Sequence, residues 1–231
     1  MTVQYWSDFN CPFCYIGETR FKKAMAEFPE LKDVPLEFKA FELDPSAPEK
    51  AEGEIVTLMA KKYGVPEEVA ARQIQSITAM GAEEGLDMRY ATAKSTNSMD
   101  AHRLTNYARE QGPETAEKLI TALYDAYFTR NLELADPEIL CAIGEECGLD
   151  PAEIRQVLQS DRYRQEVLQD EREAARYGIR AVPFFLIGKY GVSGAQPVEI
   201  MREAIRKAME DSGEFFRDPG GAACSGESCS I

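Results

Sequence analysis

The sequence predicts an α/β fold in which one sheet is built from two separated parts of the chain. Residues 3–40 have the pattern of a strand, a helix and a second strand, and residues 183–209 have that of two strands and a helix. Helix-start signals recur throughout the segment between them. We therefore expect a discontinuous α/β domain of residues 1–48 and 178–212, a helical insertion domain of residues 49–177, and a flexible tail of residues 213–231.

The N-terminal part begins with a β-branched and aromatic segment, residues 3–6, which is typical of a strand. Pro12 then fits the first position of a helix, because its missing N–H costs no hydrogen bond there. Apolar side chains recur at helical spacing up to Phe28, and Pro29 is expected to end the helix. Residues 36–40 alternate apolar and polar side chains, as a half-buried strand does.

The middle of the chain shows several helix-start signals. They are Pro66, Asn97, Asp136 before Pro137, and Asp150 before Pro151. Asp150 and Glu153 also have the spacing of a capping box. Further on, residues 183–187 and 190–193 are predicted strands joined by a turn, and residues 197–209 are a predicted amphipathic helix.

Composition and charge exclude several classes of function. The 231 residues include 40 acidic and 26 basic side chains, and the formal net charge of −14 repels phosphate backbones and anionic membrane surfaces. We therefore expect no nucleic-acid partner and no membrane association. The N-terminal sequence lacks the basic and apolar segments of a secretory signal, which predicts a cytoplasmic protein. His102 is the only histidine, so a zinc site with several histidine ligands is excluded.

We expect the reactive residues in the segment Cys11-Pro12-Phe13-Cys14, which lies between a predicted strand and a predicted helix. With Cys11 at the N-cap, its sulfur is expected to face the unpaired N–H groups of Phe13 and Cys14, which favour a thiolate. Cys14 lies one turn further on the same helix face, where it can attack a mixed disulfide formed at Cys11. Cys11 is thus the predicted nucleophile and Cys14 the resolving thiol.

A structural zinc site is an alternative interpretation of this pair. It needs a second pair of cysteine ligands, which Cys224 and Cys229 could supply. Their spacing is unusual for zinc, and a CxxC pair between a strand and a helix is typical of redox proteins. We therefore expect redox chemistry and no metal.

Four motifs follow one another along the chain: WSDFNCPFCYIG (6–17), NSMDAHR (97–103), VPFF (182–185) and GVSGAQ (191–196). Together they resemble the DsbA family of thioredoxin-fold thiol:disulfide oxidoreductases, in particular its FrnE-like cytoplasmic subgroup. The resemblance covers about residues 1–212. It implies a thioredoxin fold interrupted by an all-helical domain, a redox-active Cys11–Cys14 pair, and a cis peptide bond between Val182 and Pro183.

The resemblance also implies where a substrate binds. A cis bond at Pro183 leaves the Val182 backbone groups free to pair with an extended substrate beside Cys11. Pro12 and Phe13, between the cysteines, complete the expected binding surface. The strongly oxidising periplasmic members have a histidine where this chain has Phe13, which can neither donate a hydrogen bond nor carry charge toward the Cys11 thiolate. We therefore expect a more reducing potential here.

His102 and the turn at residues 193–196 are further candidate binding residues. His102 points away from the apolar stripe of its predicted helix. It is therefore either a polar residue at the surface or between domains, or part of a helix that covers the active site and assists proton movement or a bound group. Ser193 and Gln196, the latter the expected N-cap of the last helix, either bind an anionic group such as a peptide carboxylate or glutathione, or serve only as a structural cap.

The remaining cysteines differ in their expected roles. Cys141 and Cys147 are separated by about 9 Å of rise on one predicted helix and face different directions, so we expect buried side chains and no disulfide. Cys224 and Cys229 are either an auxiliary dithiol that exchanges electrons with the Cys11–Cys14 pair, or part of an unstructured exposed end.

The predicted function is that of a cytoplasmic enzyme that exchanges disulfides with protein thiols or small-molecule thiols, including glutathione mixed disulfides. No metal or organic cofactor is expected, and the oligomeric state is left open. One alternative is a glutathione-dependent isomerase or transferase of the kappa-like branch. Those relatives commonly have a serine at the position of Cys11, so the presence of both cysteines argues against it. The other alternative is a cysteine-based metal-binding module.

Overall fold

The computed structural model describes residues 1–212. The expected tail, with Cys224 and Cys229, lies outside the described residues. Within the described part of the chain, no helix is both long and apolar enough to cross a membrane.

The sheet confirms the predicted α/β fold class. Its four strands are β1 (Val3–Ser7), β2 (Leu36–Ala40), β3 (Phe184–Ile187) and β4 (Tyr190–Ser193), in the order β2-β1-β3-β4. β1 is parallel to β2 and antiparallel to β3, and β3 is antiparallel to β4. The two ends of the chain therefore build one sheet, and the helices of the middle segment are inserted between β2 and β3.

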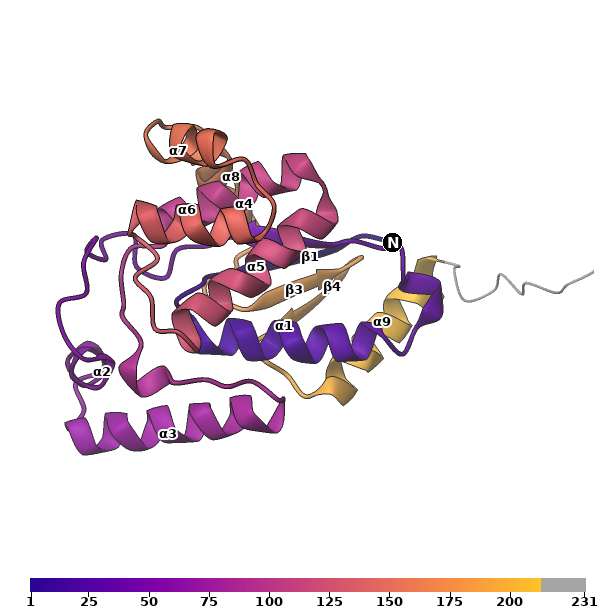
Figure 1. The fold of residues 1–231 in the computed structure, drawn as a ribbon. Coiled ribbons are helices and arrows are strands. Elements are labelled where there is room, and N and C mark those ends of the chain that lie inside the picture. Colours follow the sequence, from indigo (N-terminus) through magenta and orange to yellow (C-terminus); the bar gives the residue numbers. More distant parts are fainter. Residues whose placement is uncertain (213–231) are drawn as a thin grey trace, which may run out of the picture.

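Two helices from the ends of the chain pack side by side against the sheet (Figure 1). They are α1 (Pro12–Met25) and α9 (Val198–Ser212). The inserted helices are α2 (Ile55–Tyr63), α3 (Glu67–Glu83), α4 (Met99–Gln111), α5 (Pro113–Phe128), α6 (Pro137–Glu146), α7 (Pro151–Leu158) and α8 (Arg164–Arg176). A short 3-10 helix, η1 (Pro29–Leu31), lies between α1 and β2, and another, η2 (Tyr90–Thr92), lies between α3 and α4.

Helix caps account for several of these starts. The Asp136 and Asp150 carboxylates accept hydrogen bonds from the first turns of α6 and α7, as predicted. Asn97 Oδ1 accepts a hydrogen bond from the N–H of Met99, the first residue of α4. The first helix ends at Met25, three residues earlier than expected, because Phe28 is already extended before Pro29.

Helix α8 is attached directly to the sheet by its Asp170. The Trp6 indole N–H donates to the Asp170 backbone oxygen at 3.0 Å, and the Asp170 carboxylate accepts from the Ala40 N–H at 3.0 Å. The buried apolar side chains of the sheet and the inserted helices form one continuous core. The proposed division into an α/β domain and an insertion domain stays a prediction.

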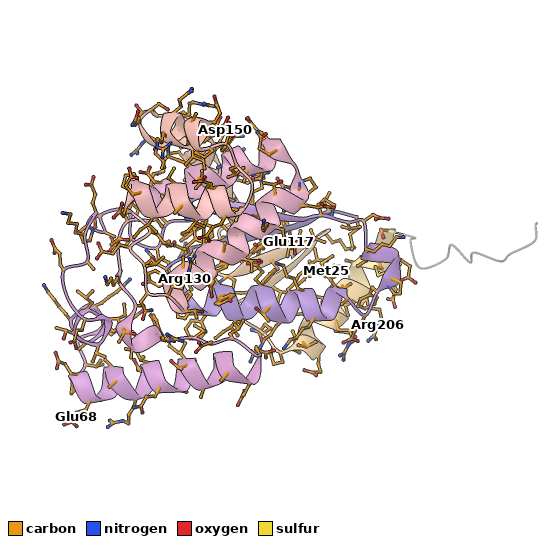
Figure 2. All side chains as sticks on the ribbon, in the orientation of Figure 1. Met25, Glu68, Glu117, Arg130, Asp150 and Arg206 are labelled. Carbon is orange, nitrogen blue, oxygen red and sulfur yellow. The ribbon has the colours of Figure 1, made fainter. Side chains whose placement is uncertain are left out.

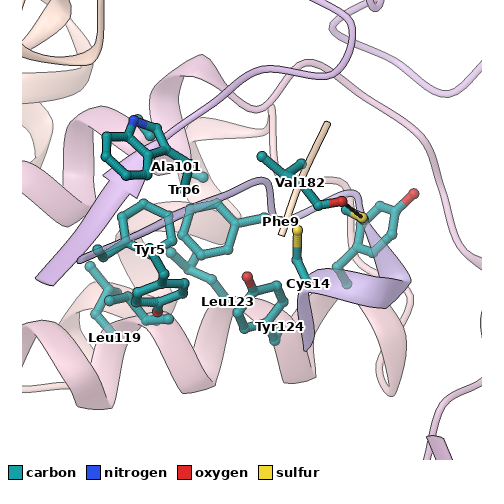
Figure 3. Packing of buried hydrophobic residues seen from close by; sticks show 14 of the residues in the cluster. Tyr5, Trp6, Phe9, Cys14, Ala101, Leu119, Leu123, Tyr124 and Val182 are labelled. Carbon is teal, nitrogen blue, oxygen red and sulfur yellow. Dashed lines mark hydrogen bonds between the residues drawn. The ribbon is translucent and has the colours of Figure 1, made fainter. Parts of the chain in front are cut away.

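The core beneath the sheet is strongly aromatic. Tyr5 stacks on Phe185 with 5.6 Å between ring centroids, and Phe21 also stacks on Phe185, at 4.8 Å. Figure 3 shows another part of the core, in which Phe9 and Tyr124 lie near Cys14 at the start of α1. Charged side chains such as Glu68 and Arg206 lie on the outer surface of the helices (Figure 2).

Candidate active site

The start of α1 places both cysteines of the CxxC segment at the end of β1. Cys11 is the N-cap residue, as predicted, with an extended backbone, and its N–H donates to the Asp8 carbonyl oxygen at 3.1 Å. The Cys14 N–H donates to the Cys11 carbonyl oxygen at 3.0 Å, which closes the first helical turn. Both thiols are free and buried, with Cys11 4% and Cys14 0% exposed.

The Cys11 sulfur contacts the loop before β3. Its thiol donates a hydrogen bond to the Val182 carbonyl oxygen at 3.7 Å, and the Val182–Pro183 peptide bond is cis, as expected. The prediction that the helix N–H groups bind this sulfur is wrong for the described structure, because α1 has no side-chain cap hydrogen bond. The sulfur instead faces the Val182 carbonyl oxygen, an acceptor to which a thiol can donate a hydrogen bond.

Cys14 lies deeper than Cys11, and its thiol holds its proton strongly. Burial is the main reason that its pKa is raised well above the ordinary value, and the hydrogen bond and charge of Cys11 raise it further. The Ser7 hydroxyl and the Asp8 backbone partly oppose this. Cys14 therefore keeps its proton until a nearby group can accept it.

A glycine lets α1 approach the Pro183 loop closely. A Cβ atom at Gly17 would lie 2.8 Å from Pro183 Cγ. The turn after β4 is tied to the same loop, because the Gly194 N–H donates to the Pro183 carbonyl oxygen at 2.8 Å. Arg20 of α1 donates to the Ala195 carbonyl oxygen at 2.7 Å. These contacts fix the position of the loop beside the two cysteines.

The expected N-cap role of Gln196 is wrong. The last helix begins at Val198, directly after Pro197, and the Gln196 side-chain amide instead donates to the Ser193 carbonyl oxygen at 2.9 Å. Proline sets its own φ and preorganises the helix start, so no polar side chain is needed at Gln196. Ser193 is exposed at the end of β4. A binding role for Ser193 and Gln196 stays a prediction.

His102 is buried beside the active site, so its interpretation as a surface residue is wrong. It is 0% exposed, and its ring packs against Phe9 and Phe38, with ring centroids 5.0 and 5.7 Å away. Its Nε2 lies 3.6 Å from Asp8 Oδ1, an ion-pair distance that is too long for a hydrogen bond. The prediction assumed that only the apolar stripe of this helix is buried. It failed because α4 packs against α5, α6, α7 and α8 and therefore has more than one buried face.

Asp8, which the sequence analysis missed, lies under this histidine. Burial by itself raises the pKa of Asp8, but the interactions with His102, the Leu43 N–H and Ser98 outweigh burial and lower it. Asp8 Oδ2 accepts from the Leu43 N–H at 2.7 Å. The available signal was that Asp8, three positions before Cys11, is the only acidic residue among residues 1–17.

The other predicted residues divide between exposed and buried positions. Phe13 is 38% exposed next to Cys11, whereas Pro12 is buried. Cys141 and Cys147 are free and buried, as expected. Among the described residues, no group of three or more histidine, cysteine, aspartate or glutamate side chains could hold a metal ion.

The fold and the cysteine pair at the start of α1 define a thioredoxin-like oxidoreductase. The chain belongs to the DSBA-like thioredoxin domain family, whose model matches residues 2–206. It is a thiol:disulfide oxidoreductase of this DsbA-like class. The FrnE-like subgroup stays a prediction.

Three known proteins illustrate the similarity. The crystal structure of a "probable DsbA oxidoreductase" from Streptomyces coelicolor is 36% identical, with a TM-score of 0.86 over 100% of this chain and 99% of that chain. The uncharacterized protein YwbO of Bacillus subtilis (strain 168) is 27% identical over 88% of this chain and 94% of its own. The cytosolic disulfide reductase DsbM from Pseudomonas aeruginosa shares the fold at 16% identity, with a TM-score of 0.57 over 93% and 98%.

The lowered pKa of Asp8 predicts how stability depends on pH. A carboxyl whose folded-state pKa is depressed stabilises the fold above its unfolded value, about pH 4, and loses this contribution as pH falls toward the folded value. We expect Asp8→Asn to lower the free energy of unfolding by about 3–5 kcal/mol at neutral pH, since it leaves His102 without its partner. The difference from the wild type should shrink below about pH 4, as measured by urea denaturation.

Asp87→Asn is the matched control, because Asp87 is an exposed aspartate paired with Arg89. Its free energy of unfolding should stay within about 0.5 kcal/mol of the wild type. An Asp8→Asn protein as stable as the wild type at neutral pH would contradict the role given to this buried pair.

Proposed function

We propose that the protein exchanges disulfides through Cys11 and Cys14 with protein thiols or glutathione mixed disulfides. The observation that carries this proposal is the position of the Cys11 sulfur, at the N-cap of α1 and 3.7 Å from the Val182 carbonyl oxygen, with Cys14 buried behind it. The first thiol can reach a substrate that lies along the Val182 loop, and the second cannot.

The proposed reaction has two steps. Cys11 attacks the substrate disulfide as a thiolate, one substrate thiolate leaves, and a mixed disulfide remains on Cys11. Cys14 then attacks the Cys11 sulfur, which releases the second substrate sulfur as a thiolate and forms the Cys11–Cys14 disulfide. The substrate disulfide is reduced by two electrons and the cysteine pair is oxidised by two. The opposite direction uses the same atoms in reverse.

The surface around Cys11 supports an extended thiol-bearing substrate. The half-exposed Phe13 ring offers an apolar contact beside the sulfur. The Val182 backbone offers polar groups to a segment lying against it. We propose that Phe13, Val182 and Pro183 bind the substrate, while Pro12, which is buried, fixes the helix start.

The proposed direction is reduction in the cytoplasm, with glutathione as a co-substrate and no metal or organic cofactor. DsbM, which has a similar fold, is described as a cytosolic disulfide reductase and has also been solved with GSH. Both cysteines of the CxxC pair are present here, as thiol exchange requires. A glutathione transferase or isomerase needs only one thiolate-stabilising position, so this pair favours exchange.

The two-step reaction predicts which variant accumulates substrate. Cys14→Ser removes the resolving thiol, so mixed disulfides on Cys11 should persist and be identified by mass spectrometry of protein purified from a cell extract. Cys11→Ser should carry no adduct at Cys14, because Cys14 is fully buried. Cys141→Ser, a change at a buried cysteine of α6, should behave as the wild type. Adducts on Cys14 instead of Cys11 would reverse the proposed roles.

The residue between the cysteines predicts the redox potential. A histidine in place of Phe13 can donate a hydrogen bond or carry charge toward the Cys11 thiolate, which stabilises the reduced form. We expect Phe13→His to raise the reduction potential by at least about 30 mV, equivalent to about 1.4 kcal/mol for a two-electron couple, in a glutathione redox titration. An unchanged potential would show that position 13 does not set the redox equilibrium.

A further inference from the structure

Two arginines lie on the connection between α8 and the cis proline, next to the loop along which the substrate is proposed to bind. Arg176 is the last residue of α8, and Arg180 lies two residues before Val182. Both residues are exposed, and within residues 1–212 neither side chain has an ion pair or a hydrogen bond. Their guanidinium groups are therefore available to a ligand. An inference drawn from this position rests on the proposed function.

Contacts at both ends fix this connection against the end of β1. The Tyr177 ring packs edge-on against the Trp6 ring, with 5.7 Å between the centroids. Further along, the Val182 carbonyl oxygen lies 3.7 Å from the Cys11 sulfur. Since a residue spans at most about 3.6 Å of chain, the Cα atoms of Arg180 and Val182 lie within about 7 Å of each other. The Arg180 side chain can therefore reach a substrate that lies along the Val182 loop.

The carboxylates of α8 that are nearest to these arginines in the sequence have other partners. Glu173 Oε2 pairs with Lys39 Nζ at 3.3 Å. Glu171 Oε1 accepts a hydrogen bond from the Glu42 N–H at 3.0 Å. The positive charge of the connection is thus not neutralised by its own helix.

The start of α1 adds positive charge at the same edge of the sheet. This helix has no side-chain cap and no acidic residue in its first turn. The N–H groups of such a helix start carry partial positive charge and favour an anion. Asp8, the carboxylate beside it, is 1% exposed and is paired with His102. The surroundings of Cys11 therefore suit an anionic ligand, although the whole chain has a formal charge of −14.

We propose that Arg180 binds an anionic group of the substrate, and that the preferred substrates are disulfides of thiols with a carboxylate close to the cysteine. The guanidinium can bind a carboxylate through two parallel hydrogen bonds. A carboxylate one or two residues from the substrate cysteine lies about 3–7 Å further along an extended segment, which matches the reach of Arg180. Arg176 adds attraction at longer range. Glutathione, with a carboxylate on each side of its cysteine, and an acidic peptide are the two sources of this group.

The test compares small disulfides of different charge on the full chain. Reduced protein is mixed with 3,3′-dithiodipropionate (anionic), 2-hydroxyethyl disulfide (neutral) or cystamine (cationic), and mass spectrometry measures the formation of the Cys11–Cys14 disulfide over time. Each rate is divided by that of the same disulfide with dithiothreitol, which corrects for intrinsic reactivity. At low salt the corrected rate should be about fivefold higher for the anionic than for the neutral disulfide, the upper end for an exposed ion pair, and lowest for cystamine.

The decisive variant is Arg180→Gln. Its ratio of anionic to neutral rates should fall to within about twofold of unity, because the charge that attracts the carboxylate is gone. A general loss of activity lowers both rates and leaves this ratio unchanged.

Arg155→Gln is the matched control. Arg155 is an exposed arginine of α7 whose side chain has no ion pair among the described residues, and α7 lies apart from α1 (Figure 1). This substitution changes the net charge by the same amount as Arg180→Gln. It should keep the wild-type ratio, since the proposed attraction is local.

Salt supplies a second readout that needs no variant. At about 1 M salt, where the Debye length is about 3 Å, the wild-type ratio should also fall to within about twofold of unity. A ratio that persists at this salt concentration contradicts an attraction between charges.

Peptide disulfides separate the two sources of the carboxylate. Disulfides of the end-blocked tripeptides Glu-Cys-Ala and Gln-Cys-Ala differ only in one charge, and both are compared with glutathione disulfide. A faster reaction of the Glu-Cys-Ala disulfide than of its Gln-Cys-Ala counterpart supports an acidic peptide as the substrate. A preference confined to glutathione disulfide supports glutathione.

The outcomes also separate the two proposals. A wild type that exchanges with all three small disulfides but does not prefer the anionic one, or an Arg180→Gln protein that keeps the wild-type ratio, overturns the role of Arg180 and leaves the exchange reaction intact. A wild type that reacts with none of the disulfides overturns the proposed function and the role of Arg180 together.

Discussion

The contact between the Cys11 sulfur and the Val182 carbonyl oxygen depends on the pairing of β1 with β3. In this antiparallel pair Trp6 lies opposite Phe184, so the residues that follow β1 and the residues that precede β3 meet at the same edge of the sheet. α1 begins at that edge, and the Gly17–Pro183 approach holds it there. Two segments about 170 residues apart in sequence thus become the two sides of one site.

A layer of buried polar groups beneath the cysteines ties this edge to the inserted helices. Ser7 reaches Tyr124 of α5, and Asp8 reaches His102 of α4. Buried polar groups are costly unless they have partners, so the end of β1 needs α4 and α5 in place to be stable. The helices inserted between β2 and β3 are therefore part of the environment of the active site, and they supply groups that touch or neighbour the reacting sulfur atoms.

Local chemistry explains which features the sequence could predict. The strand periods, the Asp136 and Asp150 caps, and Cys11 at the N-cap depend on a few neighbouring residues, and the structure has them. The error at His102 arises where several elements meet. A helical wheel assumes one buried face, so it misplaced His102. The pairing of Asp8 with His102 joins the end of β1 to α4, and no local pattern of residues reveals it.

The different roles of Cys11 and Cys14 are tested most directly by measuring how fast iodoacetamide alkylates each cysteine in the reduced native protein at neutral pH. The account predicts that Cys11 reacts at least about tenfold faster than Cys14, because Cys14 is fully buried and its pKa is raised. Blocking Cys11 in this way should also abolish disulfide exchange. Equal reaction rates at the two cysteines, or exchange that survives alkylation of Cys11, would contradict the account.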